Sequence, residues 1–155
     1  MFFQWRHYDD FGMVWRNCGV CLCFKAVLDI LENIKLKKTT VLGGTLFYQH
    51  AGKIRITTEF QSIKDNTVNC ILGSVWRNVW EVKREIKGGY IKPIGINGNK
   101  QLSKQQRTLM PYRSRIIQPG IFLKEKLLLA PTLDSQSSAY LSFCGIKFND
   151  FLENH

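Results

Sequence analysis

The sequence lacks a run of about 20 uncharged apolar residues, the length that a helix needs to cross a bilayer. Its longest apolar stretch, residues 14–31, is interrupted by Arg16, Lys25 and Asp29. An ordinary transmembrane helix is therefore excluded. The first residues also lack the basic leader of a secretory signal, because two aspartates stand there, and we expect no such signal.

N-x-S/T sequons are absent, and the cysteines are odd in number. The five are Cys18, Cys21, Cys23, Cys70 and Cys144. This combination favours an intracellular, reducing compartment over a secreted disulfide framework, with an organelle such as a plastid left open. A structural zinc site needs four ligands, and only the first three thiols cluster. We expect no metal site and interpret the cluster as small hydrophobic residues, with metal or redox use as the alternative.

Catalytic motifs are missing. The histidines His7, His50 and His155 have no partner at metal-ligand spacing and lie in no nucleophile motif. The glycines of residues 95–100 lack the spacing of a phosphate loop, so that stretch is interpreted as a glycine loop. The catalytic residues, if there are any, are unknown from the sequence, and no cofactor is indicated.

Acidic residues are scarce in one part of a chain whose net charge is +10. Residues 87–126 contain nine basic side chains and a single acid, Glu125. An excess of positive charge favours polyanionic partners such as nucleic acid, anionic lipid or an acidic protein. We call residues 87–126 the basic segment.

Hydrophobic periodicity predicts one helix followed by strands. Apolar residues spaced by three and four positions over 20–37 indicate an amphipathic helix. After Gly43 and Gly44 the period becomes two, most cleanly over 53–60. Further strands are expected at 45–50, 67–72, 75–86, 90–96, 112–118, 121–129 and 139–148, with a loop at 97–104 and a turn at Pro119-Gly120.

These elements predict a mainly β fold (β-rich α+β) in a single domain over 1–155. The domain would comprise an arm at 1–17, the helix at 20–37 and an antiparallel β-meander over 45–148. A meander can close into a small β-barrel, which removes exposed edges, or form a curved sheet against the helix. Both architectures stay open.

The basic segment indicates a non-enzymatic binding protein that engages RNA or a ribonucleoprotein. Phosphates require long cationic side chains, and unpaired bases stack on aromatic rings. The candidate nucleic-acid-binding residues are Lys100, Lys104, Arg107, Tyr112, Arg113 and Arg115. The alternative is an ordinary solvated surface, since lysine and arginine are common on any protein.

Short segments resemble the S-type phycobiliprotein chromophore lyases, a family of lipocalin-like barrels. They are residues 27–31, Gly43 to Phe47, Arg113-Ser114-Arg115 and residues 142–147. The aromatic pair and the acidic residues of that family before Arg-x-Arg are absent here. The resemblance implies a barrel that binds a hydrophobic or open-chain tetrapyrrole (bilin) ligand and passes it, as a chromophore lyase, to an acceptor protein. Arg113 and Arg115 would then pair with the propionates of the pigment.

Overall fold

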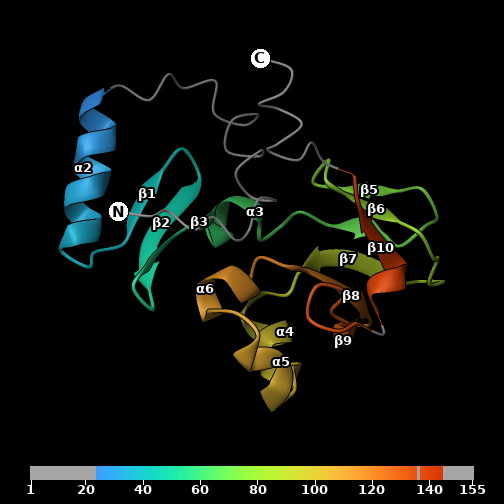
Figure 1. The fold of residues 1–155 in the computed structure, drawn as a ribbon. Helices are drawn as coiled ribbons and strands as arrows, with labels where there is room; N and C mark the ends of the chain where they lie inside the picture. The colour runs from blue at the N-terminus through green and yellow to red at the C-terminus, as the bar shows by residue number, and fades with distance from the viewer. Residues whose placement is uncertain (1–23, 136, 145–155) are drawn as a thin grey trace. The chain divides into compact units, whose positions relative to one another are not determined.

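The structure is a computed structural model that describes residues 24–135 and 137–144 (Figure 1). The predicted arm at 1–17 and the cysteine cluster at 18–23 lie outside the described residues. Contacts divide the chain into two compact units, whose described parts are residues 24–59 in one and 60–135 and 137–144 in the other. The prediction of a single domain stays a prediction.

The first unit is a helix packed on a three-stranded antiparallel sheet. It comprises α2 (Phe24–Lys35), β1 (Thr40–Leu42), β2 (Thr45–His50) and β3 (Lys53–Thr58), in the sheet order β1-β2-β3. Ile30 and Ile34, one helical turn apart, are buried against Phe47 of β2. Gly43 and Gly44 have φ of 55° and 75°, which L-residues rarely adopt, and make the turn between β1 and β2.

The second unit contains two small antiparallel sheets and several short helices. One sheet has the order β10-β6-β5 and the other β4-β7-β8-β9. The elements in chain order are α3 (Phe60–Ile63), β4 (Val68–Asn69), β5 (Val75–Trp76), β6 (Trp80–Val82), β7 (Tyr90–Pro93), α4 (Gly95–Gln101), α5 (Lys104–Thr108), α6 (Tyr112–Arg115), β8 (Pro119–Leu123), β9 (Lys126–Leu129), the 3₁₀ helix η1 (Ser138–Tyr140) and β10 (Leu141–Phe143).

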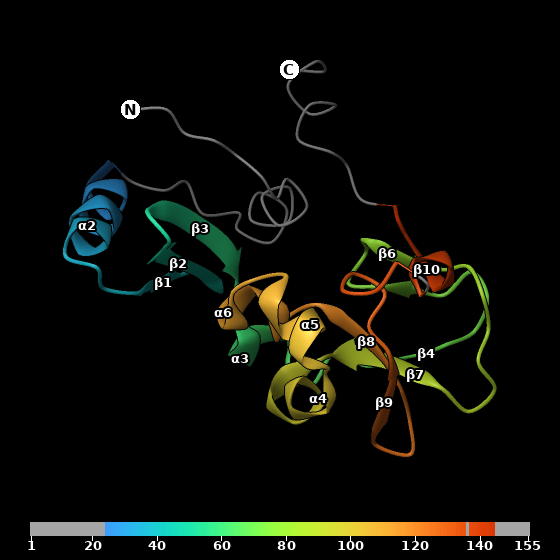
Figure 2. The ribbon, with the colours of Figure 1, turned by 60° about the horizontal axis from the view of Figure 1, so that its bottom comes forward.

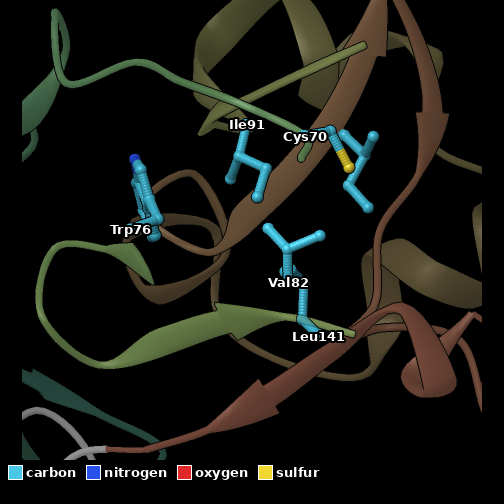
Figure 3. Close-up of a cluster of buried hydrophobic side chains, with 6 residues drawn as sticks. Cys70, Trp76, Val82, Ile91 and Leu141 are labelled. Atoms are coloured by element: carbon cyan, nitrogen blue, oxygen red, sulfur yellow. The ribbon is translucent and has the colours of Figure 1, made fainter. Parts of the chain in front are cut away.

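Side chains from both sheets form the main core of this unit. Figure 3 shows Cys70, Trp76, Val82, Ile91 and Leu141, all buried and in one cluster with Ile121. Trp76 is completely buried, and its indole Nε1 donates a hydrogen bond to the carbonyl of Asn66 at 3.0 Å. Large apolar side chains with a satisfied polar atom are stable in such a core.

A second cluster lies beneath the short helices. Ile94 and Leu102, at the two ends of α4, are buried with Ala130 and Leu133, and Met110 and Leu127 pack against them. This cluster fixes the helical region onto the β8–β9 hairpin. It therefore places the basic segment on a packed support.

The mainly β prediction is confirmed, and every strand pair is antiparallel. None of the three sheets closes into a barrel in the part of the chain that the structure describes. The predicted helix is present as α2, and β2 has the predicted bounds. No helix in the described ranges has the length and hydropathy that crossing a membrane requires.

Four local predictions are wrong. The expected loop at 97–104 lies in α4 and the start of α5, and α6 occupies the start of the expected strand at 112–118. Pro119-Gly120 is not a turn but the start of β8, where Pro119 pairs with Pro93 at the end of the ladder, a position that proline tolerates. The expected strand at 75–86 is interrupted between β5 and β6 by a turn with positive φ.

Candidate nucleic-acid interface

The basic segment folds into three short helices between two strands of one sheet. Helices α4, α5 and α6 follow β7 and precede β8, and they lie together in the second unit (Figure 2). Their exposed side chains include Lys100, Lys104, Arg107, Arg113 and Tyr112. The structure thus brings five of the six predicted nucleic-acid-binding residues to the surface of one helical region.

Helix α5 begins at a capping box. The Ser103 hydroxyl accepts a hydrogen bond from the Gln106 amide, and the Gln106 side chain accepts one from the Ser103 amide. This reciprocal cap satisfies two N–H groups that a helix start leaves without partners. It also fixes the register of the helix, so that Lys104 and Arg107 are three residues apart and share one side.

Two arginines donate hydrogen bonds to backbone carbonyls at the ends of these helices. The Arg107 guanidinium donates to the carbonyl of Lys100 at 2.7 Å, at the end of α4. The Arg115 guanidinium donates to the carbonyls of Arg107 and Met110, at and just beyond the end of α5. Carbonyls at helix C-termini lack hydrogen-bond donors inside the helix. Both arginines provide such donors.

Arg115 is the sixth predicted residue, and the structure places it inside. It is only 7% exposed, and its Nε also donates to Oδ1 of Asn99 in α4 at 2.7 Å. Burial lowers the pKa of its guanidinium, and the nearby positive charge of Arg107 lowers it further. Arg115 therefore joins the three helices, and its predicted contact with RNA stays a prediction.

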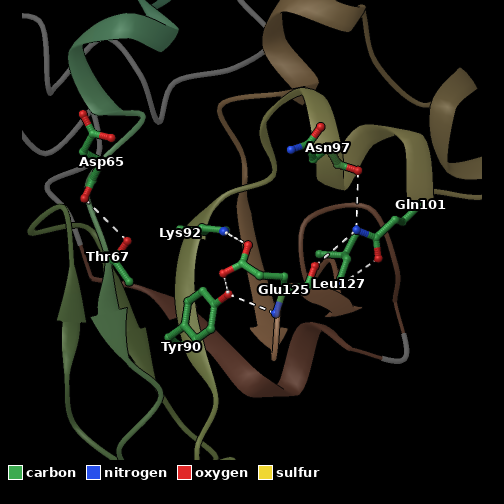
Figure 4. A network of polar contacts seen from close by, with 8 residues as sticks. All are labelled: Asp65, Thr67, Tyr90, Lys92, Asn97, Gln101, Glu125 and Leu127. Atoms are coloured by element: carbon green, nitrogen blue, oxygen red, sulfur yellow. Dashed lines mark hydrogen bonds and ion pairs between the residues drawn. The ribbon is translucent and has the colours of Figure 1, made fainter.

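The single acid of the basic segment, Glu125, is hydrogen-bonded to two neighbouring side chains (Figure 4). Glu125 accepts hydrogen bonds from Lys92 Nζ at 2.7 Å and from the Tyr90 hydroxyl at 2.5 Å. The hydrogen bond from Lys92 and then that from Tyr90 lower the pKa of this carboxyl. Helices α4, α5 and α6 contain no acidic residue, and the single carboxylate of the basic segment pairs with Lys92.

Gln101 fixes α4 to the hairpin that contains Glu125 (Figure 4). Its amide nitrogen donates to the carbonyls of Asn97 and Glu125, at 3.5 and 3.4 Å, and its oxygen accepts from the Leu127 amide at 2.9 Å. Lys124 and Lys126 flank Glu125 and are exposed. The predicted nucleic-acid-binding residues do not include these two lysines, which belong to the same basic segment.

The other sequence candidates give no site among the described residues. His50 is exposed at the end of β2, and His7 and His155 lie outside the described residues, as do Cys18, Cys21 and Cys23. No group of three or more His, Cys, Asp or Glu side chains gathers within the described ranges. Cys144 is exposed, whereas Cys70 is buried. This burial raises the pKa of the Cys70 thiol.

The glycine stretch at 95–100 has a packing role. A Cβ at Gly98 would lie 3.0 Å from Cζ of Phe122 and 3.1 Å from Cγ2 of Ile94. This glycine therefore allows α4 to approach β8 closely.

No feature of the described residues favours the tetrapyrrole hypothesis for Arg113 and Arg115 over RNA binding, and that hypothesis stays untested.

Comparison with known proteins gives one limited likeness. No family model matches the chain, and no solved structure matches it significantly. A tRNA(Ile)-lysidine synthase of Ruegeria pomeroyi is 26% identical over 107 residues, which cover 68% of this chain and 25% of that protein. The chain thus corresponds to about a quarter of the length of this curated relative.

Proposed function

We propose that this protein is a non-enzymatic RNA-binding protein that engages tRNA through the helices α4, α5 and α6. The observation that carries the proposal is the group of exposed cations on these helices, beside a single acid that Lys92 already engages. Phosphate neutralisation by lysine and arginine dominates the affinity of proteins for nucleic acid. Lys100, Lys104, Arg107 and Arg113 are the proposed phosphate contacts.

The support beneath these side chains favours a defined surface. Arg107 and Arg115 satisfy carbonyls at the ends of α4 and α5, and Gln101 fixes α4 to the hairpin. Side chains held on a packed support lose less conformational freedom on binding than side chains on a mobile loop. This arrangement suits recognition of a folded RNA with phosphates at fixed spacings.

The relative supports tRNA as the class of RNA. Its name specifies tRNA(Ile) as the molecule on which it acts. Because this chain corresponds to about a quarter of that protein, the proposal takes over the RNA partner and not the catalysed reaction.

A direct test compares two variants with the same loss of charge. The first replaces Lys100, Lys104 and Arg113 by glutamine, and the second replaces Lys35, Lys37 and Lys38, which are exposed in the first unit. Both lower the net charge from +10 to +7. Affinity for a tRNA(Ile) transcript is measured by fluorescence anisotropy, and circular dichroism verifies that each variant is folded.

The first variant should bind about tenfold more weakly than the wild type, since exposed ion pairs contribute about 0.2–1 kcal/mol each. The second should bind almost as tightly as the wild type. Equal losses in the two variants would show a non-specific charge effect. Wild-type protein that does not bind the transcript would refute the proposal.

A further inference from the structure

Tyr112 is an exposed aromatic side chain in the middle of the basic segment. The segment contains three aromatic residues. Tyr90 and Phe122 stack on each other with ring centres 5.9 Å apart, and the Lys92 ammonium lies 4.8 Å from the centre of Phe122. Tyr112 instead remains 45% exposed. Phe122 is buried and Tyr90 is half-buried, so Tyr112 is the most exposed aromatic ring of this segment.

The position of this ring is fixed by its surroundings. The guanidinium carbon of Arg115 lies over the ring, 5.9 Å from its centre. Arg115 is itself held by Asn99 Oδ1 and the Met110 carbonyl. The Ile116 amide donates to the carbonyl of Tyr112, which holds the backbone in a helical turn. One side of the ring therefore has a rigid cationic neighbour, and the exposed remainder is accessible.

We infer that Tyr112 is a stacking platform for an unpaired base of the bound RNA, with Arg115 as the residue that positions its ring. This inference rests on the proposed RNA-binding function. Stacking on an aromatic ring tolerates every base, because each base has a π-face. In a paired A-form helix the faces of the bases are covered by their neighbours, so the platform selects an unpaired nucleotide.

The charges around the ring suit the phosphates of such a nucleotide. Arg113 follows Tyr112 directly and is exposed. Arg107 is exposed in the last turn of α5, and its positive charge acts on the Arg115 guanidinium, which donates to the Arg107 carbonyl. A phosphate beside them would offset this repulsion, since an anion stabilises nearby guanidinium groups. The platform and the phosphate contacts are therefore parts of one surface.

The test uses two RNAs that carry the fluorescent base 2-aminopurine. In one, a hairpin, the base is in an unpaired loop. In the other, a duplex of equal length and charge, it is paired. Wild-type protein should quench the loop base on binding, because stacking on tyrosine quenches its emission. Tyr112→Phe keeps the ring and should retain the quenching.

Tyr112→Leu removes the ring but leaves an apolar side chain at an exposed position. It should bind the hairpin about tenfold more weakly without quenching, in line with the usual contribution of one stacked base. Its affinity for the duplex should equal that of the wild type. This difference between the two RNAs separates stacking from a general loss of binding.

The outcomes separate this inference from the function on which it rests. If Tyr112→Leu binds and quenches the hairpin as the wild type does, the stacking platform is wrong, although RNA binding stands. If the wild-type protein binds neither RNA, both the platform and the proposed function fail.

Discussion

Replacing the buried Arg115 by methionine should markedly lower the urea concentration at which the protein unfolds. The guanidinium makes three hydrogen bonds, to Asn99 Oδ1 and to the carbonyls of Arg107 and Met110. Methionine has a similar length and can fill the space, but it donates no hydrogen bond. The carbonyl acceptors would then lose their partner in a region that is largely shielded from water.

The magnitude follows from two opposing contributions. A hydrogen bond to a charged group stabilises a protein by about 1.5–3 kcal/mol, and Arg115 donates three. Transferring the guanidinium out of water costs several kcal/mol and offsets part of this gain. The net loss for Arg115→Met is therefore about 2–4 kcal/mol. Asn99→Ala removes one of the three acceptors and should cost about 1–2 kcal/mol.

Urea denaturation followed by tryptophan fluorescence measures these differences. The matched control is Lys104→Met, which also replaces a cation by methionine, at an exposed position of α5. A surface substitution of this kind changes stability by about 0.5 kcal/mol or less. If Arg115→Met were as stable as the wild type, or if Lys104→Met cost as much, the positioning role of Arg115 would be refuted.

Two further predictions concern the β8–β9 hairpin. Gly120→Ala would place a Cβ 2.7 Å from Cε2 of Phe122, so it should cost about 1–3 kcal/mol in urea denaturation, and wild-type stability would contradict this packing. The hydrogen bond from Lys92 lowers the pKa of Glu125. The stabilisation that this carboxylate contributes to the fold is therefore complete above the ordinary carboxyl pKa, and it is lost as the pH falls through the pKa of the folded state. Glu125→Gln should therefore lower Tm at about pH 7, and this difference should shrink as the pH falls below the ordinary carboxyl pKa. A difference that stays constant down to about pH 2 would contradict the interaction.

Local periodicity predicted α2, β2 and β3 of the first unit, but not β1. Ile30 and Ile34 of α2 contact Phe47, whereas Leu28 and Leu31 of the same helix are 44% and 39% exposed. The change to a period of two after Gly43 predicted β2 and β3. Ile54 and Ile56 of β3 pack against the same cluster as Phe47, and this alternation of apolar residues leaves a pattern in the sequence.

The helices of the second unit are too short to leave such a pattern. Helices α5 and α6 have five and four residues, less than two turns, so their periodicity cannot be recognised. One signal was available, because Ser103 and Gln106 have the spacing of a capping box. The hairpin turn at Lys124 and Glu125 has φ of 47° and 64°, which neither residue type indicates.

The basic segment could be predicted from the sequence, but the role of each arginine could not. Charge counts showed where cations exceed acids, and the structure places most of those cations at the surface. Arg113 and Arg115 look equivalent in the sequence, yet one is exposed and the other is buried. That difference depends on the end of α5 and on Asn99, which the fold brings to Arg115 from earlier in the chain.

The dependence of tRNA affinity on salt tests the central proposal most directly. Each phosphate contact contributes about 0.7–0.9 to the slope of log K against log salt concentration. The affinity of the wild type should fall steeply with salt. The variant that lacks Lys100, Lys104 and Arg113 should have a slope smaller by about 2–3, whereas the variant at Lys35, Lys37 and Lys38 should keep the wild-type slope. A wild-type affinity that does not change with salt, or identical slopes in all three proteins, would contradict the account.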